Sequence, residues 1–229
     1  MFFFDPIYML FMAPAFVLML LTSWYVRSAY KKWSRVPTGS RLTGLQAAQR
    51  LISTGGLYGL NIEGVGGNLS DHYDPRTKTL RLSQGVANNA SVAAVAIAAH
   101  ELGHAMQDAE DYLPLRFRAA LVPAVNIGSW LGWILIAVGL FLNMVNLAWL
   151  GVLVFSGGAL FALATLPVEL DASARAKRLL ADTGIVLSEQ ERRGVNNVLN
   201  AAALTYVAAL VTAVLQVLYF ASLVGGRRD

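Results

Sequence analysis

Two histidines and a glutamate fall within five positions of the segment AIAAHELGHAMQDAEDYLPL (96–115). His100, Glu101 and His104 match the pattern His-Glu-x-x-His, and they use two of the three histidines in the chain. On a helix, positions i and i+4 lie on one face, so both imidazoles can bind the same metal ion. Zinc lowers the pKa of a bound water to about 7, and the neighbouring carboxylate can take its proton as the water attacks a carbonyl. The segment therefore predicts a zinc site in which Glu101 is the catalytic acid and base.

The alternative interpretation is a chance match, because a histidine on an apolar helix face is often a core residue with a hydrogen-bond partner. The stretch from Ser91 to Ala99 contains no ionisable residue, so the motif stands alone in an apolar helix. This context favours a metal site. Gly103 lies between the two histidines. Its lack of a side chain either leaves space between the ligands or allows close packing against a neighbouring helix.

A third ligand is needed, because a catalytic zinc ion usually has three protein ligands and one open position. No histidine follows His104 within a dozen residues, and the first acidic residues after a long apolar hairpin are Glu169 and Asp171. We expect Glu169 as the third ligand, because an unpaired carboxylate at the edge of a membrane would be costly. Asp171 is expected to hydrogen-bond a ligand or to replace Glu169. A carboxylate that only stabilises a helix N-terminus is the alternative for both residues.

The third histidine, His72, lies in the sequence SDHYDP, in a short strand-like segment that ends at the turn DPRT. It is a candidate catalytic residue that donates a hydrogen bond to the transition state, or a residue of an edge strand that receives an extended peptide. A turn residue ahead of Asp74 is the structural alternative. Tyr73 and Arg175 are weaker candidates for stabilising an oxyanion.

The composition is that of a membrane protein. Among 229 residues, 56% are hydrophobic and 14% are charged, whereas about a quarter of the residues are charged in a soluble domain. The net charge of +4 comes with basic residues that cluster beside apolar stretches, so a lipid bilayer rather than nucleic acid is the expected partner. The absence of cysteine excludes thiolate metal sites and cysteine nucleophiles.

Four apolar segments are long enough to cross a bilayer, which takes roughly 20 residues of helix. They contain no Asp, Glu, Lys, Arg or His, which argues against a transporter. Basic residues flank them mainly in 27–120 and 167–196, so these two segments are predicted to be cytoplasmic and both termini to lie outside. The predicted order is a transmembrane helix at 6–26, a polar domain at 27–120, a transmembrane hairpin at 121–166, a polar segment at 167–196 and a transmembrane helix at 197–224.

The polar domain combines helices with short strands. A capped amphipathic helix is expected at 43–56, strands around LSDHY and KTLRLS, and a helix at about 91–108 that carries the histidines. The fold class is thus a mainly α membrane protein with four transmembrane helices and a small α+β cytoplasmic domain.

Three motifs, in order along the chain, carry a resemblance to a known family. LSDHYDPRTKTLRLS, AAHELGHAMQ and PVELDASARA resemble the YugP-type neutral zinc metallopeptidases over nearly the entire chain. The resemblance implies a zincin-like domain, one zinc ion, Glu169 as third ligand and a bacterial inner-membrane location. More distantly, the chain is similar to the HtpX and CAAX-prenyl protease group, in which an Asp follows the carboxylate ligand by four residues. That position is Ser173 here, so the resemblance leaves open which group hydrogen-bonds the zinc-bound histidine.

The leading hypothesis is a membrane-integral zinc endopeptidase that cleaves membrane proteins or peptides near the cytoplasmic face. The alternative is a catalytically silent zinc-binding scaffold or adaptor, and Glu101 favours the enzyme because a structural site needs no acid or base. The sequence leaves open the natural substrate, a homo-oligomeric state and a regulatory membrane partner.

Overall fold

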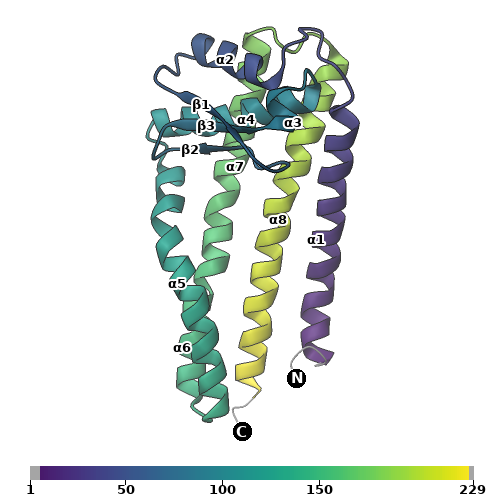
Figure 1. The fold of residues 1–229 in the computed structure, drawn as a ribbon. Helices are drawn as coiled ribbons and strands as arrows, with labels where there is room; N and C mark the ends of the chain where they lie inside the picture. Colours follow the sequence, from purple (N-terminus) through teal and green to yellow (C-terminus); the bar gives the residue numbers. More distant parts are fainter. Residues whose placement is uncertain (1–5, 227–229) are drawn as a thin grey trace. The chain divides into compact units, whose positions relative to one another are not determined.

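The computed structural model describes residues 6–226, and these are mostly helical with one small sheet (Figure 1). The helices are α1 (Pro6–Trp33), α2 (Gly44–Thr54), α3 (Gln84–Ala87), α4 (Val92–Ala109), α5 (Leu113–Phe141), α6 (Val145–Phe155), α7 (Gly157–Asp182) and α8 (Glu189–Gly225). The strands are β1 (Asn61–Val65), β2 (His72–Asp74) and β3 (Thr79–Ser83). The predicted position of the two chain ends concerns residues outside the described range.

The chain divides into two compact units. The apolar unit contains the described residues of 6–23, 116–167 and 204–226, and the polar unit contains 24–115 and 168–203. Four helical stretches are long and apolar enough to cross a membrane: Pro6–Trp33, Leu113–Phe141, Val145–Asp182 and Glu189–Gly225. A mainly helical protein with four membrane-length helices and a small sheet is therefore confirmed.

Several helices extend beyond the apolar stretches that the hydropathy pattern marks. Helix α7 continues from the apolar unit through Glu169 to Asp182 and ends before Gly184, whose φ of 60° stops the helix. Helix α8 begins in the polar unit, where the Glu191 carboxylate accepts hydrogen bonds from the backbone N–H groups of Leu187 and Ser188. Hydropathy locates only the apolar part of each helix, because caps and breakers, not polarity, determine where a helix ends.

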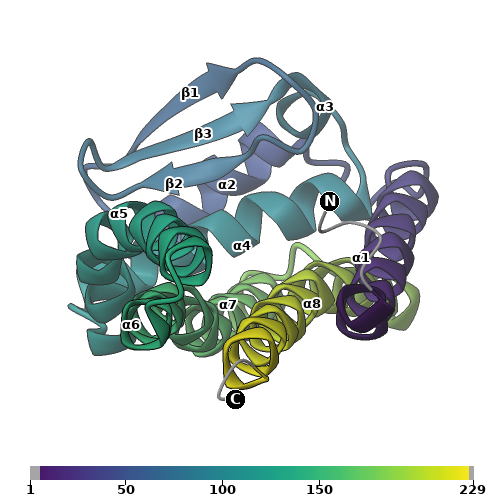
Figure 2. The ribbon, with the colours of Figure 1, turned by 90° about the horizontal axis from the view of Figure 1, so that it is seen from below.

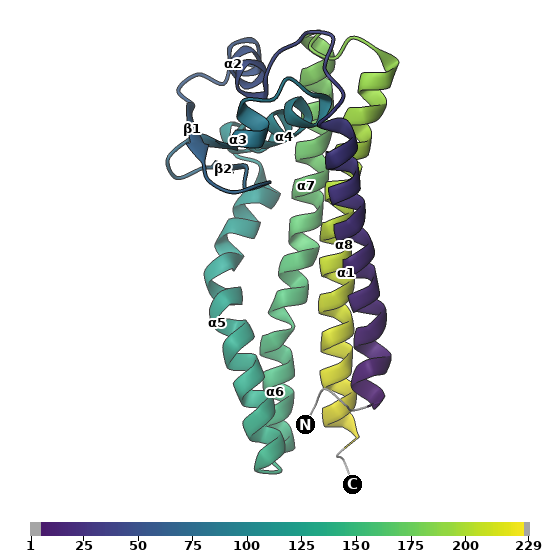
Figure 3. The ribbon, with the colours of Figure 1, turned by 45° about the vertical axis from the view of Figure 1, so that its right-hand side comes forward.

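Small residues hold helices α5 and α6 together within the apolar unit. A Cβ atom on Gly139 would lie 2.5 Å from the backbone nitrogen of Ala148, and one on Gly151 would lie 2.6 Å from that of Ile136. These contacts require glycine, as is common where membrane helices pack closely. Helices α1 and α8 lie side by side (Figure 3). The buried Tyr219 of α8 meets the Tyr8 ring of α1 edge-on, with the ring centres 5.1 Å apart.

The sheet of the polar unit has the strand order β1-β3-β2, with β1 parallel and β2 antiparallel to β3 (Figure 2). Leu80 and Leu82 of the central strand are fully buried in one core with Leu51 of α2 and Leu102 of α4. Strand β2 is an edge strand and lies beside α4. The sheet therefore brings a short, exposed strand edge next to the helix that carries the histidines.

Helix α4 has a defined start and a buried first half. The Ser91 hydroxyl caps it by accepting a hydrogen bond from the backbone N–H of Ala94 at 3.3 Å. Most of the residues from Val92 to Ala99 are buried. The side chains of this half of the helix are apolar on every face, so the whole half can pack into the core. The core thus holds the N-terminal half of α4, and the polar residues that follow begin at His100.

Candidate metal centre

The two histidines of α4 project from one face of the helix. His100 and His104 are four residues apart, and their ring centres are 4.9 Å apart with an interplanar angle of 80°. Their side chains are 13% and 12% exposed. The helical period therefore places two ring nitrogens beside each other in a nearly enclosed position.

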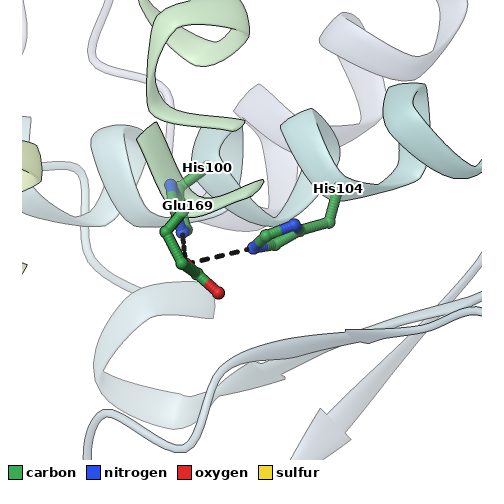
Figure 4. Close-up of side chains that lie close together, drawn as sticks. All are labelled: His100, His104 and Glu169. Carbon is green, nitrogen blue, oxygen red and sulfur yellow. Dashed lines mark hydrogen bonds and ion pairs between the residues drawn. The ribbon is translucent and has the colours of Figure 1, made fainter. Parts of the chain in front are cut away.

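Helix α7 supplies the carboxylate from a distant part of the sequence. The Nε2 atoms of His100 and His104 lie 3.3 Å and 3.4 Å from the same carboxylate oxygen of Glu169, and that side chain is only 3% exposed (Figure 4). One donor atom from each of the three residues falls within 4.8 Å of the others. Within the described chain, these residues form the cluster that could hold a metal ion.

The approach of α7 to α4 depends on Gly103. A Cβ atom at this position would collide with the backbone carbonyl of Ala172 on α7. Any side chain would push the two helices apart and move Glu169 away from the imidazoles. Of the two explanations that the sequence left open for Gly103, the structure favours packing against a neighbouring helix.

Glu101 is held by the edge strand of the sheet. Its carboxylate accepts a hydrogen bond of 3.0 Å from the backbone N–H of Tyr73 in β2. The side chain is only partly exposed, and this burial raises the pKa of the Glu101 carboxyl above its ordinary value. A carboxylate with a raised pKa next to two imidazoles is suited to accepting and returning a proton.

The other candidates lie farther from the cluster or are bonded elsewhere. His72 is exposed, and its Nδ1 atom lies 2.8 Å from the carbonyl oxygen of Ser70. Neighbouring side chains on a strand point to opposite faces, and Tyr73 faces the core, so His72 points to the outer face of the sheet. The Tyr73 hydroxyl donates to Asp108 at 2.8 Å, and Arg175 pairs with Asp171 and Glu110. The structure does not bring these three side chains together with the donor cluster.

Two polar side chains contact the outer nitrogens of the histidines. The Ser173 hydroxyl lies 3.2 Å from Nδ1 of His100, and the Gln107 side-chain oxygen lies 3.0 Å from Nδ1 of His104. Asp171 contacts neither histidine and instead accepts a hydrogen bond from Gln107. Sequence reasoning missed Gln107, although its position three residues after His104 puts it on the same helix face.

Comparison with known proteins identifies the family. The family model described as "Putative neutral zinc metallopeptidase" matches residues 8–225. The chain is also 41% identical over 204 residues to the "Putative membrane protease YugP" of Bacillus subtilis (strain 168), covering 89% of this chain and 90% of that protein. The chain belongs to the neutral zinc metallopeptidase family. No solved structure matches it.

Membership of the zinc metallopeptidase family makes the protein a hydrolase whose cofactor is zinc, and its relative indicates a membrane protease. The donor cluster fits this metal chemically, since two imidazoles and a carboxylate are a common ligand set of catalytic zinc. Ligand atoms about 2.0–2.1 Å from a tetrahedral zinc ion are roughly 3.3 Å apart. The distances of 3.3 Å and 3.4 Å between Glu169 and the histidines match that spacing.

We predict that Gly103→Ala weakens the metallopeptidase by separating α4 from α7. Overpacking of this kind typically costs about 1–3 kcal/mol, so we expect a lower melting temperature in detergent and a reduced zinc content. The matched control is Gly64→Ala on β1, where an added Cβ meets no atom within 4 Å. Thermal melts and metal analysis of both variants check this. A Gly103→Ala protein with wild-type melting and full zinc would contradict the proposed contact.

Proposed function

We propose that this zinc metallopeptidase is a membrane-integral endopeptidase that cleaves membrane proteins or peptides near the cytoplasmic face. His100, His104 and Glu169 are proposed to hold one zinc ion, and Glu101 to act as acid and base. The observation that carries the proposal is the position of Glu101. It is partly buried, adjacent to a ligand histidine, and held by a backbone N–H donor. A silent zinc scaffold has no use for this arrangement.

The proposed reaction is hydrolysis of a peptide bond. Zinc, when bound, supplies a Lewis acid that polarises the scissile carbonyl and acidifies water. The Glu101 carboxylate accepts one proton from the attacking water while the water oxygen bonds to the carbonyl carbon. Glu101 then returns this proton to the amide nitrogen as the carbon–nitrogen bond breaks, leaving an amine and a carboxylic acid that keeps the second water proton. The N–H of Tyr73 keeps the Glu101 carboxylate in one orientation throughout.

The substrate is proposed to bind as an extended strand along the exposed edge of β2. Edge strands can pair with an extended peptide, and β2 is a sheet edge beside α4, where the N–H of Tyr73 already donates to Glu101. His72 belongs to this strand and is proposed to contact the substrate rather than the metal, because its ring is exposed on the outer face. A peptide on this edge would lie close to Glu101.

Glu101→Gln is expected to keep its zinc and to lose activity. The amide keeps the size of the side chain but cannot take a proton, so kcat should fall by about 10²–10⁴-fold. Purified wild type and variant are compared for bound zinc and for cleavage of an unstructured protein. Glu63→Gln, an exposed carboxylate on β1, is the matched control. Equal cleavage by Glu101→Gln and wild type would disprove the mechanism.

Glu169→Ala is expected to lose zinc, because it removes the carboxylate that faces both histidines. Metal analysis after dialysis measures the loss, and Glu189→Ala, an exposed carboxylate of α8, serves as control. Full zinc retention would move the third ligand to Asp171 or His72. Asp171→Ala and His72→Ala would then identify which of the two residues it is.

The cytoplasmic placement of the site is proposed from charge alone. Basic residues concentrate in 27–120 and 167–196, whereas the apolar hairpin has an uncharged turn. Under this proposal, both polar segments lie in the cytoplasm and contribute to the catalytic domain. The bacterial inner membrane is the proposed location, in keeping with the bacterial relative.

Cysteine labelling tests this topology, because the chain has no cysteine of its own. Tyr58→Cys lies in an exposed loop of the polar unit, and Asn146→Cys lies at an exposed position in the first turn of α6, next to the connection from α5. An impermeant maleimide added to bacterial spheroplasts should label Asn146→Cys at once and Tyr58→Cys only after permeabilisation. The reverse pattern would show that the proposed orientation is inverted.

A further inference from the structure

Gln107 is a buried polar side chain at the junction of α4 and α7. It is fully buried, and both polar atoms of its side chain have hydrogen-bond partners. Its oxygen lies 3.0 Å from Nδ1 of His104. Its nitrogen donates to the carbonyl oxygen of Val168 and to the carboxylate of Asp171, both at 2.8 Å. The residue thus touches one ligand histidine and the residue that precedes Glu169.

These contacts determine which way the Gln107 amide points. A backbone carbonyl and an ionised carboxylate only accept hydrogen bonds, so the NH₂ group must face Val168 and Asp171. The amide oxygen is then left to face His104, and it can only accept. Nδ1 of His104 must therefore carry a hydrogen, so in the neutral ring the lone pair lies on Nε2. That Nε2 atom is the one that lies 3.4 Å from Glu169.

Asp171 is itself held in place from the other side. Arg175 donates to its carboxylate through Nε at 2.6 Å and to Glu110 through Nη1 at 2.7 Å. The guanidinium also lies over the ring of Tyr112, with 5.6 Å to the ring centre. Because arginine stays charged, it keeps Asp171 in the acceptor form that orients Gln107.

His100 lacks a comparable constraint. Its Nδ1 atom faces the Ser173 hydroxyl at 3.2 Å, and a hydroxyl can rotate to donate or to accept. The contact with Ser173 is therefore compatible with either neutral tautomer of His100. The two ligand histidines differ in this respect, and only the contact to His104 dictates a tautomer.

We propose that Gln107 is a positioning residue that fixes His104 in the tautomer with hydrogen on Nδ1 and ties α7 to α4 beside Glu169. The inference rests on the proposed zinc site, since it assigns Nε2 of His104 to the metal. Gln107 acts on two of the three donors at once. It determines that the lone pair of His104 lies on Nε2, and it hydrogen-bonds the backbone carbonyl of Val168, the residue before Glu169.

The test uses the full-length protein in detergent and three substitutions. Gln107→Met keeps the length of the side chain without a hydrogen-bonding group, whereas Gln107→Glu keeps an acceptor for His104. Ser173→Ala is the matched control, because it removes the corresponding contact of His100. Two quantities are measured: the zinc dissociation constant, and the tautomers of the metal-free histidines by ¹⁵N NMR at a pH where the rings are neutral. The chain has three histidines, so the signals are assigned with His72→Ala and His100→Ala.

The expected result has three parts. His104 of the wild type shows a single tautomer with hydrogen on Nδ1, and Gln107→Met shows both tautomers and binds zinc about 10- to 100-fold more weakly. Gln107→Glu keeps the wild-type tautomer although its carboxylate loses the donors to Val168 and Asp171, which a purely structural role of the amide would not explain. Ser173→Ala leaves the His104 signal unchanged.

Several outcomes would overturn the inference. One is a wild-type His104 that carries hydrogen on Nε2 or populates both tautomers, and this measurement needs no variant to fold. Another is a Gln107→Met protein with wild-type tautomers and zinc affinity. Failure of the proposed function looks different, because a wild type that binds no zinc would still report the His104 tautomer.

Discussion

The site depends on how closely α7 approaches α4 at Gly103. The absence of a side chain there lets the backbone carbonyl of Ala172 lie against α4. Only at that separation can Glu169 face both imidazoles and Gln107 reach the carbonyl of Val168. The apolar hairpin of α5 and α6 separates the two helices in sequence, so α7 returns to the polar unit only after it. A single small residue thus determines whether groups that are distant in sequence form one cluster.

Burial gives this cluster its chemical character. A carboxylate as enclosed as that of Glu169 is costly unless cationic or hydrogen-bonding groups face it. The His100 ring, whose Nε2 lies 3.3 Å from the Glu169 carboxylate, can provide that environment, and a divalent cation between the three donors would provide more. Metal binding by these three donors would therefore also stabilise the packing of α4 on α7, as is general where ligands come from separate elements. Glu101 is less enclosed and is stabilised by a backbone N–H of β2, which leaves it free to exchange a proton.

The sequence was informative where one element contains the whole pattern. His100, Glu101 and His104 lie within five residues, so the helical period alone predicts that the two histidines share one face of the helix. Four membrane-length helices followed from hydropathy, but their polar extensions did not, since capping rather than hydropathy ends a helix. Glu169 could only be narrowed to one of two acidic residues, because its position depends on the packing of a second helix. The N–H of Tyr73 gave no signal, since every residue except proline has this donor and its use depends on tertiary contacts.

The sequence predicts a distant resemblance to the HtpX and CAAX-prenyl protease group, and the contacts of Asp171 differ from the pattern of that group. In that group an Asp follows the carboxylate ligand by four residues, a position that Ser173 occupies here, beside His100. The carboxylate of this chain lies two residues after Glu169, which directs it away from His100 and towards Gln107. A carboxylate next to a histidine can accept the histidine N–H directly. Here the Gln107 amide lies between the two groups: it accepts from His104 and donates to Asp171. With the proposed ligand set, the carboxylate of Asp171 would therefore act on His104 rather than on His100, through Gln107, while Arg175 holds Asp171 in place.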